Sequence, residues 1–424
     1  MYIAILFSFF FIKVISYGWI PLLDLKTYNT KKLSSIQVLD KELVIWEKNN
    51  EIIVQDNTCI HRKAPLSEGF IDKKTKNLCC SYHGWEYTQN GYVSHIPQMT
   101  KNLNTCYKLN TYETKEFNNI LWLNINCIED DLPSHITNVK NVCDDTVVVE
   151  LPYSMNILLE NFFDPAHIPF AHHKLQSFRE LASSVNSSLI KMDENMIQFS
   201  FEDRTLMNNN YRNGTMTFYN PNHYQLQTDY PRNLFIDSLQ IYCVPINNLK
   251  TRIFMQQAHK ESIYKDIYNK IPHFIKHILT LNFLDSDTFL LYSQQQYLLK
   301  TDSFNNSVKE YITPTSSDYS VVMFHKWLKK YSPFWLFYIY NQTSSPLLRQ
   351  DVLDRYQSHT KNCKYCNGAL ENIKKIQIGL PICILIMNIY EPMFSSLAFA
   401  FVFYLLMENL KSYFIFRDYI HNKL

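Results

Sequence analysis

Alternating apolar and polar residues mark the first third of the chain as β-structure. Three runs rich in β-branched residues follow one another, at 36–39, 42–46 and 52–55. Short runs of this kind, separated by turn residues, are typical of antiparallel strands. A further apolar run ends near residue 125, and a polar stretch that resembles a linker follows it. We predict a small antiparallel β domain over residues 18–130.

A second, larger domain is expected over residues 131–350. Alternating segments at 196–203 and 215–230 predict a large antiparallel sheet, and helical periodicity returns from about 261 to 300. The predicted fold class is therefore α+β, with a helix-grip-like second domain in which the antiparallel sheet packs around a helix.

Both ends of the chain are apolar. Residues 1–17 resemble a signal peptide or a short anchor, without the usual basic start. The apolar stretches 376–390 and 393–407 are each shorter than the ~20 residues of a helical membrane span. They are interrupted by Glu391-Pro392. We predict a helical hairpin that enters a membrane over residues 373–424, with an amphipathic or core helix pair as the alternative.

Composition and charge exclude several classes of function. Lys plus Arg (41) nearly balances Asp plus Glu (39), which argues against a nucleic-acid partner. The absence of a G-x-G-x-x-G motif argues against a bound dinucleotide, so electrons must come from another protein. The ten cysteines are unevenly spaced, which favours a reducing compartment over a disulfide scaffold.

Two loops each carry one cysteine and one histidine. Cys59 and His61 lie on the first loop, and Cys80 and His83 on the second. Two thiolates and two imidazoles suit either zinc or a Rieske [2Fe-2S] cluster. One ligand of each kind per loop favours the cluster, because each loop then supplies one ligand to each iron. Cys79 could compete as a ligand, but the C-x-x-H spacing favours Cys80. Gly69 and Gly84 are expected to allow close approach of the backbone to the cluster sulfurs.

A second constellation lies between residues 161 and 172. Asn161, Asp164 and His167 recur at three-residue steps, so on a helix they would share one face. His172 follows after Pro169, which can distort the helix and turn both imidazoles toward one metal. Two histidines and a distant carboxylate would form the facial triad of an Fe(II) oxygenase.

Four blocks resemble the Rieske oxygenases of the pheophorbide a oxygenase group, which includes chlorophyllide a oxygenase. They are C-I-H-R-K-A-P-L-S-E-G at 59–69, C-S-Y-H-G-W at 80–85, I-P-Q at 96–98 and D-P-A-H-I-P-F-A-H-H at 164–173. The resemblance covers residues 18–370. It implies that His167, His172 and Asp287 hold a mononuclear iron, since Asp287 precedes Gln294 by seven residues as in the family. Asp285 is the alternative carboxylate.

The resemblance also implies partners. Asp164 would connect His83 of the partner subunit to His167 across a homotrimer interface, and Asn161 would support the iron. Reduced ferredoxin would donate electrons, and O2 and a large apolar ring, most plausibly a chlorophyll-derived tetrapyrrole, would be the substrates. A plastid membrane is the implied location, although the segment before residue 18 leaves no room for an ordinary transit peptide. Alternatives are oxidation of a sterol, and a redox sensor or electron carrier without oxygenation.

A C-x-x-C pair, Cys363 and Cys366, precedes the apolar hairpin within a predicted segment 351–372. Such a pair can be a redox-switchable dithiol, half of a zinc site to which His359 could add a ligand, or a coincidence. In the pheophorbide a oxygenase group it is read as a thioredoxin-responsive switch, so a redox role is expected here.

Overall fold

The computed structural model describes residues 18–28, 33–99, 107–125, 131–204, 212–229, 238–259, 263–331, 346–390 and 394–421. The signal-like segment 1–17 and the turn at Glu391-Pro392 lie outside the described residues.

An antiparallel sheet forms the body of the predicted β domain. Its strands, in spatial order, are β1 (Trp19–Asp24), β10 (Ile120–Asn124), β9 (Thr111–Phe117), β4 (Glu51–Asp56), β3 (Lys41–Lys48) and β2 (Ser34–Val38). The three predicted runs are confirmed as β2, β3 and β4, because β-branched side chains pack well on a pleated surface. Asn49 and Asn50 adopt left-handed backbone in the turn between β3 and β4, a conformation that asparagine tolerates better than most residues.

A smaller antiparallel sheet extends from this domain. It comprises β5 (Phe70–Ile71), β6 (Leu78–Cys79), β7 (Glu86–Tyr87) and β8 (Val93–His95), and a 3-10 turn, η1 (Leu66–Glu68), precedes it. Its strands are too short to produce a recognisable alternation of apolar and polar residues in the sequence. They hold the loops that carry the first group of candidate ligands.

The second domain is built on a larger antiparallel sheet, as predicted. Its order is β11 (Val142–Leu151), β17 (Lys250–Ala258), β16 (Ser238–Asn247), β15 (His223–Asp229), β14 (Arg212–Tyr219), β13 (Met196–Asp203) and β12 (Asn186–Met192). Alternate residues of β16 face opposite sides. Ile241 and Cys243 join the core beneath the helices, whereas Tyr242 and Val244 pack against the first sheet. The two domains therefore share a buried interface.

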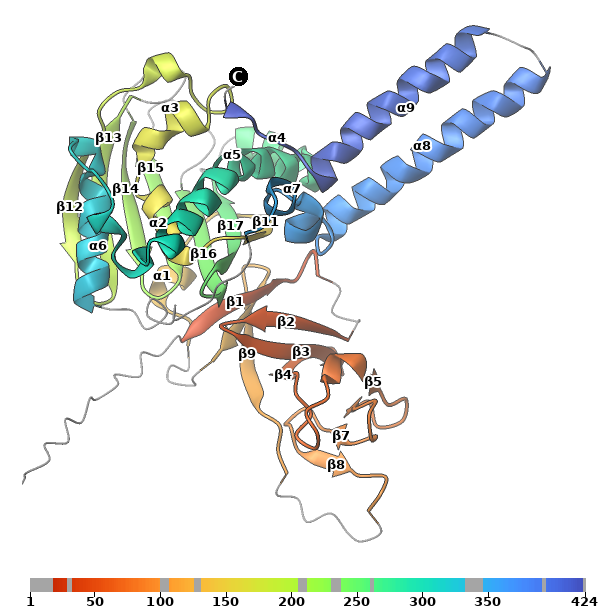
Figure 1. Cartoon of the computed structure of the whole chain (residues 1–424). Helices are drawn as coiled ribbons and strands as arrows, with labels where there is room; N and C mark the ends of the chain where they lie inside the picture. Colours follow the sequence, from red (N-terminus) through yellow and green to blue (C-terminus); the bar gives the residue numbers. More distant parts are fainter. Residues whose placement is uncertain are drawn as a thin grey trace, which may run out of the picture.

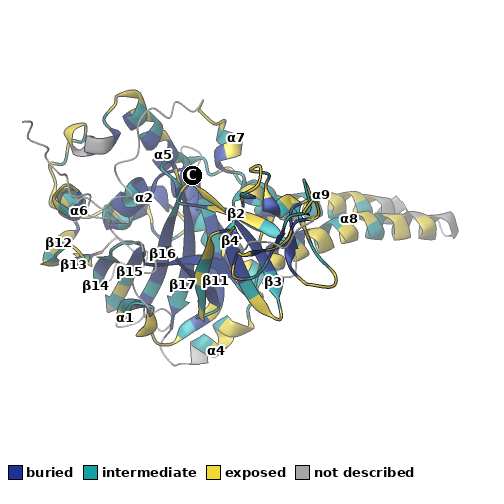
Figure 2. Cartoon of the chain, turned by 90° about the horizontal axis from the view of Figure 1, so that it is seen from below, coloured by how far each residue is buried: buried dark blue, intermediate teal, exposed yellow. Residues whose placement is uncertain are grey.

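Helices cover the face of this sheet that is turned away from the first domain (Figure 1). The longest, α5 (His273–Lys300), follows α4 (Ile263–Lys270) and confirms the predicted helical segment. The others are α2 (Met155–Phe162), α3 (Ile168–Ala171), α6 (Tyr319–Tyr331) and α7 (Arg349–Val352). The short helix α1 (Ser134–Thr137) instead packs on the side of the first domain, through Ile136. Leu281, Leu284, Leu291 and Leu298 of α5 are buried at helical spacing. Figure 2 shows the buried strands beneath these helices.

A helical hairpin projects from the body of the molecule (Figure 1). It consists of α8 (Lys364–Tyr390) and α9 (Phe394–Ile415), which pack against each other. Many of its apolar side chains are exposed (Figure 2), among them Ile378, Ile386, Phe399, Phe401 and Leu406. Among the described residues, one stretch, Ala398–Ile415, is long and apolar enough to cross a membrane; its mean hydropathy is 1.2 and 6% of it is buried. The predicted boundary between residues 372 and 373 falls inside α8, because that helix is continuous.

A buried arginine ties the base of the hairpin to α5. Arg355 is 1% exposed and pairs through Nε with Asp285 of α5. Its Nη1 donates to the carbonyl of Tyr413 in α9 (2.9 Å), and its Nη2 donates to Oδ1 of Asn282 (2.6 Å). Burial raises the pKa of Asp285, and the guanidinium of Arg355 opposes that rise. Asp285 is therefore occupied by a structural contact.

Replacing Arg355 by alanine should lower the free energy of unfolding by about 3–5 kcal/mol, because the Asp285 carboxylate is left buried without its partner. Urea unfolding of the detergent-solubilised protein, followed by circular dichroism, measures this change. Lys374→Ala is the matched control, since Lys374 forms an exposed pair with Glu371, and roughly 0–1 kcal/mol is expected there. Equal losses in the two variants would contradict the assignment.

Candidate functional site

The two Cys-His loops have the same backbone geometry. The amide of Cys59 donates to the carbonyl of Ala64, and the amide of Cys80 donates to the carbonyl of Trp85, both at 2.9 Å. The fifth residue of each loop, Lys63 or Gly84, has left-handed backbone and donates back to the carbonyl of its cysteine. Two equivalent turns thus present their ligands from opposite sides of one space.

The donor set of these loops fits a Rieske cluster. Cys59 and Cys80 are buried, with the two thiols in contact, and burial raises the pKa of Cys80. His61 is exposed and His83 is half-buried, and their rings lie edge to face with centroids 4.7 Å apart. Sulfur ligands on the inside and imidazoles on the outside suit an inner iron held by cysteines and an outer iron held by histidines. Cys79 lies on β6 with its sulfur 3.9 Å from the Asn77 carbonyl.

Two aromatic residues support the cluster ligands, and neither was given a role from the sequence. The hydroxyl of Tyr87, on β7, lies 3.0 Å from Sγ of Cys59 and is fully buried. The ring of Trp85 stacks on His61 at a centroid distance of 4.6 Å. The only sequence feature that pointed to these two residues was their position shortly after the second ligand pair. A hydroxyl that donates to a ligating sulfur favours the reduced cluster, because it stabilises the added negative charge.

The two glycines of these loops lie where a side chain would meet neighbouring protein atoms. A Cβ at Gly84 would lie 2.8 Å from Cγ of Pro97, and one at Gly69 would lie 2.2 Å from the carbonyl oxygen of Cys79. A side chain at either position would therefore clash with the protein itself, and the close approach of these glycines to the cluster sulfurs stays a prediction. Gln98 adds a hydrogen bond from Nε2 to the carbonyl of His83 (2.9 Å). The I-P-Q block thus holds the second ligand loop in place.

Three side chains converge in the second domain. Nε2 of His167 lies 3.2 Å from Nε2 of His172, and Oδ2 of Asp287 lies 3.7 Å and 3.3 Å from these two atoms. The spacings suit three cis ligands of one ion, since metal–ligand bonds of about 2.1 Å at right angles place neighbouring donors about 3.0 Å apart. The arrangement leaves the opposite positions open.

Hydrogen bonds orient both imidazoles toward that point. Nδ1 of His172 donates to Oγ of Ser286 (2.7 Å), whose hydroxyl donates to the carbonyl of Phe283 (2.7 Å). Nδ1 of His167 donates to the carbonyl of Asp164. With Nδ1 protonated in each ring, Nε2 carries the lone pair that a metal needs.

The charge balance of these residues calls for a cation. Burial lowers the pKa of His172 to about 2, so its imidazole is neutral near pH 7. Burial raises the pKa of Asp287 to about 6, and His167 opposes the rise. A buried carboxylate is costly unless a positive charge accompanies it. The donor set therefore fits a mononuclear iron.

The backbone positions of Asn161 and Asp164 differ from those predicted from the sequence. The expectation of a single helical face is wrong, because α2 ends at Phe162 and Asp164 instead caps a 3-10 turn, η2 (Pro165–His167). Asp164 accepts from the amide of Ala166 (2.9 Å), and burial raises its pKa to about 6. Nδ2 of Asn161 still lies 3.5 Å from both His167 Nε2 and Asp287 Oδ2.

The remaining carboxylate candidate lies elsewhere. Asp285 is paired with Arg355, and two residues along a helix separate it from Asp287 by about 200°. Gln294, the family partner of Asp287, donates to the hydroxyl of Tyr311 (2.6 Å) away from the iron ligands. The described residues thus bring Asp287, and not Asp285, to the two histidines.

An apolar pocket of about 140 Å³ adjoins the three ligands. Its walls include Leu158, Met216, Leu226, Ile241, Met255 and Phe283, with His167 and Asp287 on one side. A cavity near 150 Å³ holds about one benzene-sized ring. Gln176 also lines it, and its Oε1 is buried without a hydrogen-bond partner. The pocket thus offers one ring position beside the candidate iron site, with a buried acceptor in its wall.

The chain after the hairpin returns to this site, which the sequence gave no reason to expect. The hydroxyl of Tyr419 donates to the carbonyl of His173 (2.6 Å), next to the ligand His172. Arg349 donates to the carbonyl of Tyr419 (2.9 Å) and pairs with Asp418 (2.8 Å). Figure 1 shows the C-terminus beside α3. The hairpin is therefore anchored to the second domain at both of its ends.

Cys363 and Cys366 lie at the start of α8 as free, buried thiols. His277 and His359 complete a compact group with them. The C-x-x-C segment indicated His359 as a ligand, whereas no feature of the sequence indicated His277, which lies 82 positions earlier than His359.

Comparison with known proteins matches two regions of the chain. Residues 18–113 match the Rieske [2Fe-2S] domain and residues 218–304 match the pheophorbide a oxygenase domain. Flavonoid 8-hydroxylase 2 of Ocimum basilicum is 28% identical over 86% of this chain and 75% of its own. Pheophorbide a oxygenase of Oryza sativa subsp. japonica is 26% identical over 95% of this chain and 84% of its own. A crystal structure of dicamba monooxygenase shares the fold, with a TM-score of 0.59 and 13% identity over 74% of this chain and 97% of that one.

The chain is a Rieske-type monooxygenase with a [2Fe-2S] cluster and a mononuclear iron. More particularly, it combines a Rieske domain with a pheophorbide a oxygenase domain, which confirms the family predicted from the four sequence blocks.

Replacing Tyr87 by phenylalanine should lower the midpoint potential of the Rieske cluster by about 40 mV, the equivalent of roughly 1 kcal/mol for one electron. The reason is the loss of the hydroxyl that donates to Sγ of Cys59. A redox titration followed by electron paramagnetic resonance measures the shift. Tyr92→Phe serves as control, since Tyr92 is exposed. An unchanged potential in Tyr87→Phe would refute the role of this hydrogen bond.

Proposed function

We propose that this chain is a membrane-anchored, ferredoxin-dependent monooxygenase that oxidises a large apolar ring, in the first place a chlorophyll-derived tetrapyrrole. The observation that carries the proposal is the placement of His167 and Asp287 on the wall of an apolar pocket, with His172 grouped beside them, in a chain that also has a Rieske domain. Similarity to pheophorbide a oxygenases supports the substrate class.

In this proposal, different residues of the pocket have different roles. The iron, when bound, supplies O2 activation, and the Rieske cluster supplies electrons. Apolar walls exclude water and bind the face of a ring, while Oε1 of Gln176 accepts a hydrogen bond from an N–H or O–H group of the substrate. Because the enclosed volume holds about one small ring, a tetrapyrrole would insert one edge and leave the rest of its plane in the opening.

A flavonoid is the second candidate substrate. The similarity to flavonoid 8-hydroxylase 2 extends over most of the chain, and a phenolic hydroxyl would also satisfy Gln176. Oxidation of a sterol, or electron transfer without oxygenation, remains as an outcome of the experiment below.

Membrane attachment is proposed for the hairpin. Its exposed apolar side chains and the candidate span Ala398–Ile415 support insertion of α8 and α9 into a bilayer. Chloroplast names among the relatives support a plastid membrane. An apolar substrate would then reach the pocket from the lipid phase.

A head-to-tail homotrimer is proposed as the working assembly. Within one chain, β7 and β8 of the cluster region lie at the opposite end of the molecule from α2 and α3 (Figure 1). We infer that one chain does not bring its own two centres together for electron transfer, and a ring of subunits would do so. Asp164, which adjoins His167, would then face His83 of the partner subunit. Reduced ferredoxin is the proposed donor to the cluster.

The His167→Ala variant should lose product formation while it keeps the Rieske spectrum, because the mutation removes one iron ligand and leaves the first domain untouched. The measurement is mass spectrometry after incubation with reduced ferredoxin, labelled O2 and a panel of tetrapyrroles, flavonoids and sterols. Gln357→Ala, a surface change at an exposed position, is the control. Label in a tetrapyrrole from the unmodified protein supports the proposal. Label only in a flavonoid or sterol changes the substrate, and turnover that survives in His167→Ala overturns the iron assignment.

Two inactive variants should restore each other if electrons cross a subunit interface. Cys80→Ser removes the cluster and His167→Ala removes the iron. Mixed trimers purified through two different tags should show about one third of the wild-type rate, because a head-to-tail ring then holds one intact pair of centres. Simple mixing of the separately purified variants is the control. A mixed assembly as inactive as its parents would place electron transfer within one chain and contradict the trimer.

A further inference from the structure

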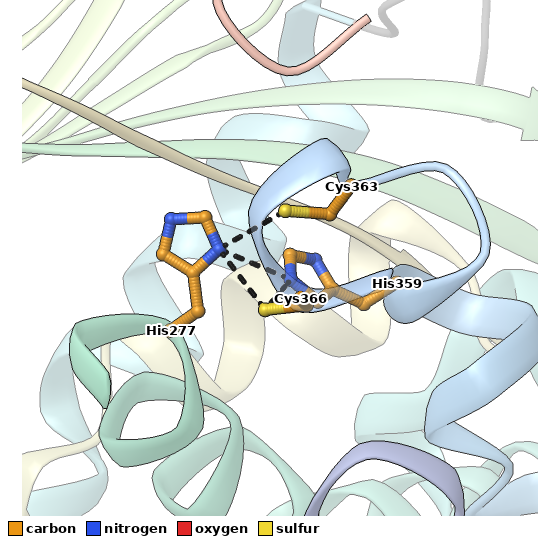
Figure 3. Close-up of side chains that lie close together, drawn as sticks. All are labelled: His277, His359, Cys363 and Cys366. Atoms are coloured by element: carbon orange, nitrogen blue, oxygen red, sulfur yellow. Dashed lines mark hydrogen bonds between the residues drawn. The ribbon is translucent and has the colours of Figure 1, made fainter. Parts of the chain in front are cut away.

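A second group of buried ligands lies outside the oxygenase centres. His277 on α5, His359 on a π-turn, η7 (Tyr356–Thr360), and Cys363 and Cys366 at the start of α8 have their donor atoms within 4.8 Å of one another. Figure 3 shows the four side chains pointing toward a common centre. All four are buried.

The spacings of the donor atoms match those of one tetrahedral ion. Nδ1 of His277 lies 3.2 Å from Nε2 of His359. It lies 3.4 Å from Sγ of Cys363 and 3.6 Å from Sγ of Cys366, and Nε2 of His359 lies 3.3 Å from Sγ of Cys366. Zinc bonds of about 2.3 Å to sulfur and 2.0–2.1 Å to nitrogen imply tetrahedral edges of about 3.3 Å between nitrogens and about 3.5 Å between nitrogen and sulfur.

The same spacings argue against a second Rieske cluster. In such a cluster the cysteines bind one iron and the histidines bind the other. Nitrogen and sulfur ligands on different irons would lie well beyond the 3.3–3.6 Å found here. The donors therefore surround a single point.

Strand β11 fixes the tautomers of both imidazoles. Nε2 of His277 donates to Oδ1 of Asp145 (3.0 Å), and Nδ1 of His359 donates to the carbonyl of Val148 (2.7 Å). These contacts leave Nδ1 of His277 and Nε2 of His359 facing each other at 3.2 Å, each able to present a lone pair to a metal. A cation between them would replace the single hydrogen bond that the two nitrogens can share. A carboxylate or carbonyl behind each ligating histidine is also the usual support of a protein zinc site.

Charge and access are consistent with a metal. Two thiolates and two neutral imidazoles around Zn²⁺ give a neutral unit, which burial tolerates. A cavity of about 280 Å³ borders His359 and Cys363 and also includes Asp24 and Glu150, so a cation has a route to the site. The sulfurs themselves are nearly inaccessible, since Cys363 is 4% and Cys366 0% exposed. A protein reductant would not reach them without a structural opening.

We propose that His277, His359, Cys363 and Cys366 form a structural zinc site that fixes the base of the α8–α9 hairpin to α5. The site joins three segments: α5, which also carries Asp287, the π-turn, and the first turn of α8. This proposal is independent of the substrate and replaces the redox switch predicted for the C-x-x-C pair.

Metal analysis of the full-length protein, purified in detergent without a histidine tag, tests the site. We expect one zinc per chain besides the iron, and zinc-edge X-ray absorption should show two sulfurs at about 2.3 Å and two nitrogens at 2.0–2.1 Å. A shell of oxygens, or no zinc, would overturn the proposal. This measurement needs no variant, so it holds even where substitutions impair folding.

Variants test the ligand assignment. Cys363→Ser with Cys366→Ser, and separately His359→Ala, should lose the zinc while the Rieske spectrum persists. His359→Cys should retain it, because Cys₃His is also a zinc ligand set. Asp145→Asn should weaken zinc binding roughly 10- to 100-fold. Cys383→Ser is the matched control, since Cys383 is an exposed cysteine of the same helix.

Two further outcomes would overturn the proposal. Zinc that survives loss of both cysteines would be adventitious. A zinc-free protein in which Cys363 and Cys366 form a disulfide, seen by thiol alkylation and mass spectrometry and reversed by thioredoxin, would establish the redox switch instead.

Discussion

The arrangement of the second domain depends on how the negative charge of the buried Asp287 carboxylate is balanced. That group lies in the wall of an apolar pocket, where an unaccompanied negative charge would be costly. The neighbouring His172 is held neutral by burial, so it supplies a ligand and little charge. A bound iron resolves the conflict. The surrounding contacts, from Ser286 behind His172 to Asn161 beside both remaining ligands, serve to keep the three donors aimed at one point.

Helix α5 connects this site to the rest of the molecule. Within 11 positions it presents His277 to the cysteines of α8, Asp285 to Arg355 and Asp287 to the iron ligands. At 1.5 Å per residue, His277 and Asp287 lie about 15 Å apart along the helix. The hairpin that we assign to the membrane is thus fixed to the same helix that carries an iron ligand. The tail after α9 adds a second attachment through Tyr419 and His173.

The sequence predicts features that depend on local patterns. The strands β2, β3, β4 and β13, the helical segment that contains α5, and the clustering of His167 with His172 all follow from periodicity or short motifs. Choosing Asp287 over Asp285 required family resemblance, because two carboxylates two residues apart look alike until the position of Arg355 is known.

Other features depend on contacts between distant segments. The end of α2 at Phe162 was missed, because Asp164 competes for the backbone as a cap and Pro165 follows it. The approach of Tyr87 to Cys59, of His277 to the C-x-x-C pair, and of the C-terminal tail to His173 is decided by packing, which no spacing in the sequence encodes. The redox prediction for Cys363 and Cys366 rested on the family resemblance and stays a prediction. The sequence indicated His359 as a further ligand of the pair but gave no signal for His277.

Anomalous diffraction from crystals of the native protein, recorded on both sides of the iron absorption edge, tests the central assignment most directly. We expect one iron peak bounded by His167, His172 and Asp287, and a separate pair of irons between the Cys59 and Cys80 loops. An iron-loaded protein with no peak beside Asp287, or with its mononuclear iron among His277, His359, Cys363 and Cys366 instead, would contradict it.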